Sequence, residues 1–294
     1  MKKDLSVIIA SFNTKDITLK CIQQLREALQ TSMLCYEIVV VDNASQDGSK
    51  EMLQAIQKDD MRLILNKTNT GYGKANNQGL AVSQGDFALY LNSDVFVDDK
   101  IHFKDLIEHM RSHKHIGALT VQVNLPDESI DPASHRGFPT LWRSFCYFVG
   151  LEKIFKNIPL LNKIFGGYHL VHLNKQLTHE IDSPTGAFFL APQPLLKKLK
   201  GFDEDFFMYG EDIDLAFRIK ELGYKIVYYP VYRVLHFKYQ SGLKKKNDPV
   251  WQKKVRGFFY EALAIFYRKH YAKLYPFVIN WFVYALIDLK KRAV

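Results

Sequence analysis

The chain has 294 residues, 47% of them hydrophobic, which is enough for one large core with room for an appendage. Its three cysteines, Cys21, Cys35 and Cys146, stand at unrelated spacings, which excludes a disulfide framework or a cysteine metal site and favours a reducing compartment. The net charge of +9 is concentrated in residues 238–294, which contain 13 basic and three acidic side chains, so the rest of the chain is close to neutral.

The chain begins by alternating strand and helix. Leu5–Ala10 is a continuous apolar run, as expected of a strand covered on both faces. The run is too short for a signal peptide, so we expect a cytosolic protein. From Ile17 to Leu29 an apolar residue recurs every four positions, which predicts an amphipathic helix. Further strands are predicted at Glu37–Val41, Leu63–Leu65 and Phe87–Leu91, and a helix is predicted from Lys74.

This alternation predicts an α/β fold with a mostly parallel central sheet and flanking helices. In such sheets, ligands bind beyond the carboxyl ends of the strands. Asp42 and Asp94 each follow a predicted strand, so we expect both carboxylates to face one crevice.

The second half of the chain is less regular. Residues 124–140 are polar and rich in turn formers, and the aromatic region Leu141–Phe165 predicts one or two amphipathic helices. Four more elements are predicted: a strand at Gly186–Ala191, a helix at Asp212–Leu222 ended by Gly223, a strand at Lys225–Tyr229, and an extended segment at Arg233–His236.

The segment Gly201–Arg218 carries six carboxylates within twelve residues, between bulky aromatic side chains, where a helix begins. A solvated acidic run would lack those aromatics, and burial raises the pKa of a carboxylate as general-base catalysis requires. Glu211 and Asp212 are therefore candidate catalytic residues. The alternative is that they are ordinary carboxylates at a helix N-terminus, stabilised by the positive end of the helix dipole. We interpret Asp214 in this way.

Three other residues suit a nucleotide or metal site. Asp42 suits a hydrogen bond from a pyrimidine ring N–H or a ribose hydroxyl, but a turn or helix N-cap explains it equally well. Asn92-Ser93-Asp94 resembles a two-carboxylate metal clamp with one member changed, or a plain turn. His236, after an apolar strand, is either a core histidine or a ligand to Mn²⁺ or phosphate.

Taken together and in order over residues 4–240, these segments resemble the inverting family 2 glycosyltransferases of GT-A fold, and most of all the bacterial polysaccharide rhamnosyltransferases. The segments that carry the resemblance are Val7–Asn13, Val41–Ser45, Asn69–Gly79, Leu91–Asp94, Thr185–Leu190, Gly201–Arg218 and His236.

The resemblance implies a site for the nucleotide-sugar donor. Asp42 would contact the pyrimidine, and Ser11 and Asn13 would line the nucleoside pocket. Asn76 or Asn77 would help to hold the base or ribose.

The resemblance also implies a metal site and a general base. Asp94 would bind Mn²⁺ or Mg²⁺ bridging the donor diphosphate, and His236 would complete that site. Asp212 would remove the proton from the acceptor hydroxyl in one inverting displacement, while Glu211 and Tyr209 shape the acceptor side. Asn92 departs from the family pattern, in which this position is often Asp, and a neutral amide binds a divalent cation less strongly.

We expect residues 1–240 to form the GT-A catalytic domain and 241–294 a basic, aromatic-rich helical tail. In the tail, Trp251, Val255, Phe258 and Phe266 recur at helical spacing, and the apolar stretch Tyr275–Ile287 is too short to cross a bilayer. Aromatic surface with Lys and Arg is typical of interfacial helices. We therefore expect peripheral contact with an anionic membrane on the cytoplasmic face, and no nucleic-acid binding. The alternative is a helical hairpin packed on the catalytic domain.

The sequence predicts a metal-dependent inverting transferase that moves a sugar from a nucleotide donor to a glycan or polyprenyl-diphosphate-linked acceptor in cell-surface polysaccharide synthesis. By resemblance, the donor is dTDP-L-rhamnose. The alternatives are a UDP-hexose or galactofuranose transferase of the same family, and a non-catalytic nucleotide-sugar-binding protein that lost turnover through Asn92. A nucleotidyltransferase is disfavoured because Ser11–Thr14 is not a glycine- and lysine-rich triphosphate loop.

Overall fold

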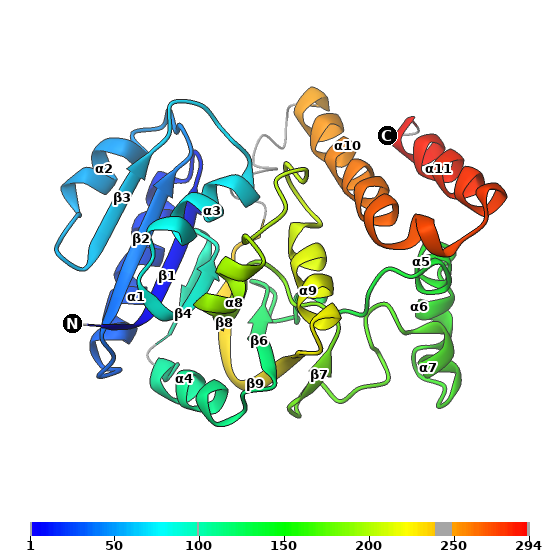
Figure 1. Cartoon of the computed structure of the whole chain (residues 1–294), viewed down its shortest axis with the longest axis horizontal. Helices are drawn as coiled ribbons and strands as arrows, with labels where there is room; N and C mark the ends of the chain where they lie inside the picture. Colours follow the sequence, from blue (N-terminus) through cyan, green and yellow to red (C-terminus); the bar gives the residue numbers. More distant parts are fainter. Residues whose placement is uncertain (1, 99, 239–248, 293–294) are drawn as a thin grey trace.

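The computed structural model describes residues 2–98, 100–238 and 249–292, and Figure 1 shows an α/β body with a group of helices at one end. The expected boundary at 240/241 lies within 239–248, outside the described residues. The side chains of 249–252, among them Trp251, and of Lys254 also lie outside them. The division into domain and tail therefore stays a prediction.

The described strands form one sheet in the order β3-β2-β1-β4-β8-β6-β9-β5, with β7 paired to β9. The half formed by β3, β2, β1 and β4 is parallel, as expected. The other half is mixed, because β8 runs antiparallel to both of its neighbours while β6 and β9 are parallel. The strands are β1 (Lys3–Ser11), β2 (Tyr36–Asp42), β3 (Met61–Leu65), β4 (Gly85–Leu91), β5 (Val95–Val97), β6 (Ile116–Asn124), β7 (His179–Ile181), β8 (Phe188–Pro192) and β9 (Lys225–His236).

Helices cover both faces of the sheet because each strand sends alternate apolar side chains to opposite sides. In β1, Val7 and Ile9 join the core beneath α1, α2 and α4, whereas Ile8 joins the core beneath α3, α8 and α9. These helices are α1 (Lys15–Gln30), α2 (Ser49–Ala55), α3 (Tyr72–Val82), α4 (Phe103–Ser112), α8 (Gln193–Lys198) and α9 (Glu211–Glu221).

Two segments differ from expectation. Lys225–Tyr229 and Arg233–His236 belong to one strand, β9, in which Pro230–Tyr232 form a bulge between residues that face Val121 and Gln122 of β6. Proline lacks an N–H for the ladder, so a bulge is favoured there. Leu141–Phe165 forms three short helices rather than one or two: α5 (Leu141–Phe148), α6 (Leu151–Phe155) and α7 (Leu161–Phe165).

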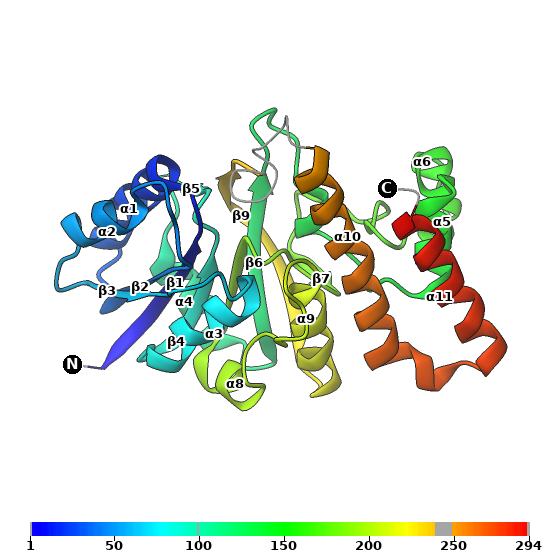
Figure 2. The same ribbon diagram turned by 90° about the horizontal axis from the view of Figure 1, so that it is seen from above.

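The C-terminal helices α10 (Pro249–Phe266) and α11 (Phe277–Arg292) differ in how they pack. Ala262 and Phe266 of α10 share a core cluster with Phe206 and Ile213, so α10 packs on the body beside α9. α11 lies beside α10 at the far end of the molecule (Figures 1 and 2), and none of its residues is buried. Among the described helices, none is both long and apolar enough to span a bilayer.

Candidate active site

The carboxyl end of β2 places Asp42 at the edge of the sheet, paired in register with Ser11 at the end of β1. Asp42 is 2% exposed, and its Oδ2 accepts a hydrogen bond from the Ser45 N–H at 3.1 Å. Its Oδ1 is buried without a hydrogen-bond partner among the described residues. Since a buried carboxylate oxygen costs free energy when it is unpaired, this atom suits the N–H or O–H of a ligand.

Ser11 and Asn13 shape the loops around Asp42. The buried Ser11 hydroxyl lies 3.1 Å from that of Thr14. Asn13 has a left-handed backbone, with φ of 52°, and its Oδ1 accepts the Gln46 N–H at 2.7 Å. Asn13 therefore fixes the loop that follows Asp42, while Ser11 lies in a hydroxyl cluster beneath it.

The two asparagines of α3 differ in their surroundings. Asn76 is fully buried, and its Oδ1 has no hydrogen-bond partner in the described structure. The Asn77 side chain makes two hydrogen bonds with the backbone of Phe202. Its Nδ2 donates to the Phe202 carbonyl oxygen at 2.8 Å, and its Oδ1 accepts from the Phe202 N–H at 2.8 Å. Asn77 thus anchors the segment that leads to Glu211.

Asp94 and His236 are brought together by the antiparallel pairing of β5 and β9, in which Val95 faces His236. His236 Nε2 lies 3.3 Å from Asp94 Oδ1 and 3.5 Å from Asn92 Nδ2. Asp94 and His236 are each 4% exposed. The predicted pair is therefore assembled at the same edge of the sheet as Asp42.

A second carboxylate, Asp131, holds the other side of the His236 ring. It is fully buried, and its Oδ2 lies 3.1 Å from His236 Nδ1 while its Oδ1 accepts from Lys238 Nζ at 2.8 Å. Burial alone would lower the pKa of His236, but the hydrogen bonds to Asp131 and Asp94 outweigh it and raise that pKa to about 9. Asp131 thereby fixes the orientation in which Nε2 faces Asp94.

The side chains at this edge fit a divalent cation that is shared with a ligand. Asp94 offers an oxygen donor, and His236 offers a nitrogen donor of the kind that Mn²⁺ accepts once the cation displaces the Nε2 proton. The Nδ1 contact with Asp131 is typical of ligating histidines. Within the described residues, no group of three His, Cys, Asp or Glu side chains is arranged to hold a metal. Donor phosphate oxygens would therefore have to complete the coordination.

The first turn of α9 carries Glu211 and Asp212. Gly210 precedes it with φ of +80°, a conformation that favours glycine and turns the chain into the helix. Asp212 Oδ2 accepts hydrogen bonds from Arg136 Nη2 at 2.7 Å and from the Gly186 N–H at 3.0 Å. Its Oδ1 accepts only the adjacent Ile213 N–H among the described contacts, which leaves room for a further donor.

Glu211 has a different environment from Asp212, although both side chains are buried. Its Oε2 has no hydrogen-bond partner in the described part of the chain. Burial, and then the neighbouring charge of Asp212, raises the pKa of Glu211 to about 8. Burial and the neighbouring carboxylate thus favour the neutral form of Glu211, whereas the Arg136 guanidinium lies against Asp212.

Hydrogen bonds connect the predicted base to the predicted metal ligands. The Tyr72 hydroxyl lies 2.8 Å from Asn92 Oδ1 and 3.0 Å from the Gly186 carbonyl oxygen. The Gly186 N–H donates to Asp212, and Asn92 lies against His236. A single network thus runs from α9 across the ends of β8 and β4 to β9.

Arg136, Asp131 and Tyr72 do not stand out in the sequence as candidate site residues. Arg136 and Asp131 belong to the polar run 124–140, which carries no periodicity, and they reach the site only through contacts 76 and 105 residues distant in sequence. Only the complete fold reveals their roles.

Residues 6–171, more than half of the chain, match the sequence pattern described as "Glycosyl transferase family 2". The chain belongs to this family. It is therefore a glycosyltransferase, and inversion at the anomeric carbon is typical of the family.

Two characterised relatives are rhamnosyltransferases. The chain is 28% identical over 217 residues to N-acetylglucosaminyl-diphospho-decaprenol L-rhamnosyltransferase of Mycobacterium tuberculosis. The match covers 69% of this chain and 67% of the relative. It is 25% identical over 243 residues to the rhamnosyltransferase WbbL of Escherichia coli, which covers 79% of this chain and 82% of WbbL.

Solved structures confirm the GT-A-like fold. Staphylococcus aureus TarS superposes with a TM-score of 0.54 and 17% identity, over 92% of this chain and 73% of that chain. The mannosyltransferase PcManGT from Pyrobaculum calidifontis, in complex with GDP-Man and Mn²⁺, superposes with a TM-score of 0.56 and 15% identity. The superposition covers 89% of this chain and 64% of that chain.

Proposed function

We propose that this glycosyltransferase transfers L-rhamnose from dTDP-rhamnose to a lipid-linked or glycan acceptor in polysaccharide synthesis. The observation that carries the proposal is the hydrogen-bonded network from Asp212 to Asn92 and His236, beside Asp94, because it links a candidate base to a candidate phosphate-metal site. The rhamnosyltransferase relatives support the sugar and the lipid-linked acceptor.

In this mechanism, Asp42 receives the thymine ring N–H at its unpaired Oδ1. Asp94 and His236 would hold Mn²⁺ or Mg²⁺, which when bound supplies positive charge to the diphosphate leaving group. Asp212 accepts the proton of the acceptor hydroxyl at Oδ1 while that oxygen attacks the anomeric carbon and the nucleotide departs from the opposite face. The configuration therefore inverts without a covalent enzyme intermediate.

Nucleotide choice is testable by thermal shift with dTDP, UDP, GDP and CDP, each in Mn²⁺ and in EDTA. Saturation at 100 times Kd stabilises the native state by about 2.7 kcal/mol, so we expect dTDP with Mn²⁺ to raise Tm by roughly 5 °C or more. The variant Asp42→Asn should lose most of that shift, because the amide no longer offers a charged acceptor at the same place.

The outcomes separate the alternatives. A larger shift with UDP keeps the enzyme class but makes the donor a UDP-hexose or UDP-galactofuranose. A shift that is equally large in Mn²⁺ and in EDTA removes Asp94 and His236 from the nucleotide site. No shift with any of the four nucleotides contradicts the proposed donor site.

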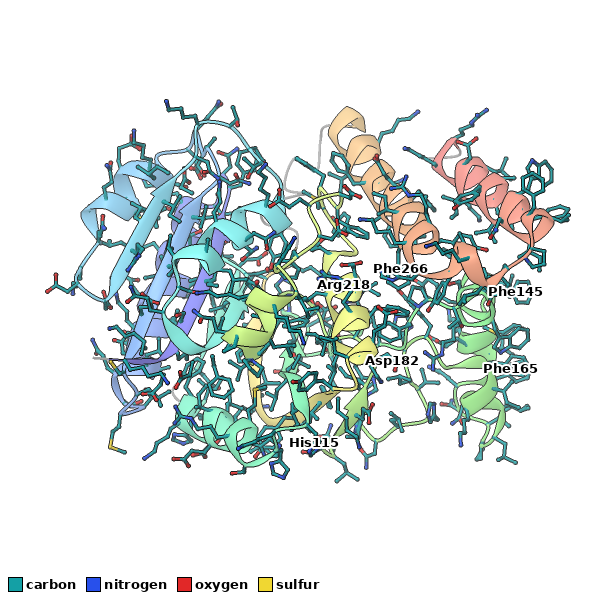
Figure 3. All side chains as sticks on the ribbon, viewed as in Figure 1. His115, Phe145, Phe165, Asp182, Arg218 and Phe266 are labelled. Atoms are coloured by element: carbon teal, nitrogen blue, oxygen red, sulfur yellow. The ribbon has the colours of Figure 1, made fainter. Side chains whose placement is uncertain are left out.

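We also propose that the C-terminal region contacts an anionic membrane surface. Of the 25 large hydrophobic side chains that are exposed in the described structure, nine lie between Trp142 and Ile164 and nine between Leu274 and Leu289. These two segments lie at the same end of the molecule (Figures 1 and 2), and Figure 3 labels Phe145 in the first of them. A patch of this kind marks an interaction surface, and the basic residues of the tail favour an anionic partner.

Full-length protein carrying Phe277→Glu, Trp281→Glu and Phe282→Glu tests this contact by flotation with phosphatidylglycerol vesicles. These side chains are 80%, 57% and 56% exposed, so the fold should persist while flotation is lost. The matched control places glutamate at Met33 and Val231, which are 82% and 60% exposed elsewhere. Equal flotation of both variants and the wild type would exclude α11 as the membrane contact.

A further inference from the structure

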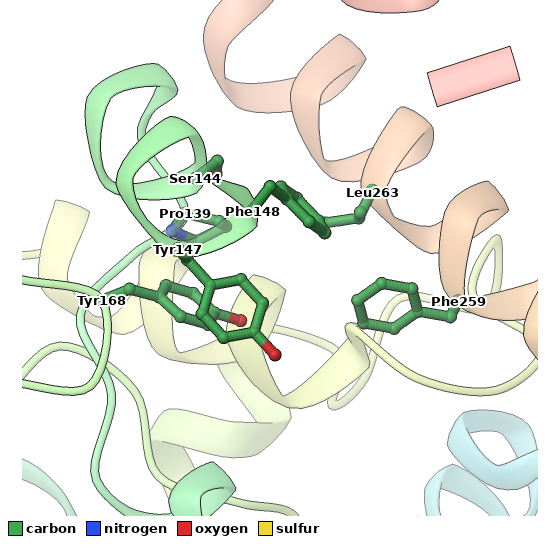
Figure 4. A pocket seen from close by; sticks show the side chains of 7 residues that line it. All are labelled: Pro139, Ser144, Tyr147, Phe148, Tyr168, Phe259 and Leu263. Atoms are coloured by element: carbon green, nitrogen blue, oxygen red, sulfur yellow. The ribbon is translucent and has the colours of Figure 1, made fainter. Parts of the chain in front are cut away.

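A narrow aromatic cleft lies between α5 and α10 (Figure 4). Tyr147 and Phe148 of α5 and Tyr168 line one side, and Phe259 and Leu263 of α10 line the other. The Tyr147 and Tyr168 rings lie 5.1 Å apart between centroids. The cleft is therefore bounded by flat apolar surfaces with phenol groups at one side.

The inner wall of this cleft touches the residues that hold the proposed base. The Arg136 guanidinium lies close enough to the buried Tyr168 phenol to oppose the rise in the Tyr168 pKa that burial causes, and Arg136 donates to Asp212 at 2.7 Å. On the α10 side, Ala262 packs in the same cluster as Ile213, the residue after Asp212. The wall of the cleft thus adjoins residues that contact or neighbour Asp212.

On the other side of Tyr147 and Phe148 lies an open cavity of about 510 Å³ at the junction of α5 and α6. Lys153 and Lys156 line it, both are exposed, and neither enters an ion pair among the described residues. Glu152, also in the lining, is occupied by His169, with 2.5 Å between its Oε1 and Nδ1 of the ring. The cavity therefore combines an aromatic wall with two positive charges that lack an anionic partner.

We propose that this cavity binds the lipid-diphosphate part of the acceptor, with the diphosphate at Lys153 and Lys156 and the first apolar units against Tyr147 and Phe148. The assignment rests on the proposed function, in which the acceptor is lipid-linked. Lysines bind phosphate groups as point charges, and aromatic faces bind an unsaturated apolar chain. The exposed apolar side chains of α5–α7 continue from the cavity, so the remainder of the chain has an apolar path to the membrane.

Farnesyl diphosphate is a direct probe, because it joins a diphosphate to a short apolar chain. We expect it to bind the full-length protein, measured by calorimetry without vesicles, and farnesol and inorganic diphosphate each to bind more weakly. Lys153→Gln with Lys156→Gln should weaken binding by about tenfold or more, since two charge-assisted contacts are lost. The matched control, Lys58→Gln with Lys114→Gln, removes two exposed lysines elsewhere and should bind like the wild type.

Three results would overturn the assignment. One is equal affinity of the Lys153/Lys156 double variant and the wild type for farnesyl diphosphate. Another is a Lys153/Lys156 double variant that loses flotation with phosphatidylglycerol vesicles but keeps farnesyl diphosphate binding. That result would make the two lysines contacts for lipid headgroups. The third is a wild-type protein that shows the nucleotide thermal shift but no farnesyl diphosphate binding. Absence of the nucleotide shift itself would instead contradict the proposed function.

Discussion

Replacing Asp212 with asparagine is expected to lower the rate of sugar transfer by about 10²–10⁴-fold, the usual contribution of a positioned general base. The amide keeps the shape of the side chain and can still accept the Gly186 N–H, but it cannot take the proton of the acceptor hydroxyl. The measurement is the acceptor-dependent release of nucleotide from the donor under single-turnover conditions. An undiminished nucleotide thermal shift in the same variant would show that the donor site is intact.

Glu211→Gln is the matched control, because Glu211 and Asp212 are adjacent and both buried. Since burial and the neighbouring Asp212 raise the pKa of Glu211 and so favour its neutral form, glutamine resembles that form. We therefore expect Glu211→Gln to lose much less activity than Asp212→Asn at pH 7. The reverse order would make Glu211 the base and would contradict the role that we assign to Asp212.

Arg136 gives the physical reason for choosing between the two carboxyl groups. Two adjacent buried carboxylates repel each other, so one of them binds a proton. The guanidinium lies 2.7 Å from Asp212 Oδ2, whereas Glu211 Oε2 has no hydrogen-bond partner in the described residues. The positive charge therefore lies against Asp212 and not against Glu211, which is why we assign the base to Asp212.

The strands and helices that the sequence predicted are those with a strong periodic or continuous apolar pattern. Leu5–Ala10 and Phe87–Leu91 became β1 and β4 because buried central strands need apolar side chains on both faces. β5 has only three residues, which is too few for a pattern, and it is stabilised by pairing with β9. β8 is antiparallel to β4, and this direction depends on the path of the chain between them rather than on local sequence.

The candidate residues that the sequence suggested follow strands, whereas those that it did not suggest come from a loop. Asp42 and Asp94 stand just after apolar runs, so the ends of parallel strands place them at one edge. Asp131 and Arg136 lie in a polar loop whose path is set by distant contacts, including the bridge between Arg136 and Ser183. No local pattern marks a loop residue that acts by holding another residue in place.

Asp94→Asn tests the proposed phosphate-metal site and should lower transfer by roughly 10²-fold or more, since a bound cation contributes several kcal/mol of charge stabilisation to the leaving group. Asparagine keeps the size of the side chain and an oxygen that can accept from His236 Nε2, and Asp131 still pairs with the ring, so the fold should persist. The Mn²⁺-dependent part of the nucleotide thermal shift should disappear, whereas any shift measured in EDTA should remain. Near-normal turnover would remove Asp94 from the mechanism.

Asn92→Asp provides the opposite test at the same place. Asn92 Oδ1 lies 2.8 Å from the Tyr72 hydroxyl, and a carboxylate oxygen can accept the same hydrogen bond. The added charge beside Asp94 should therefore tighten Mn²⁺ binding, so that less Mn²⁺ is needed for half of the nucleotide shift. If neither substitution changes how the nucleotide thermal shift depends on Mn²⁺, the contact between His236 and Asp94 is a buried ion pair of the fold rather than a metal site. Loss of metal response in Asp94→Asn and gain in Asn92→Asp would together assign the cation to the ends of β4 and β9.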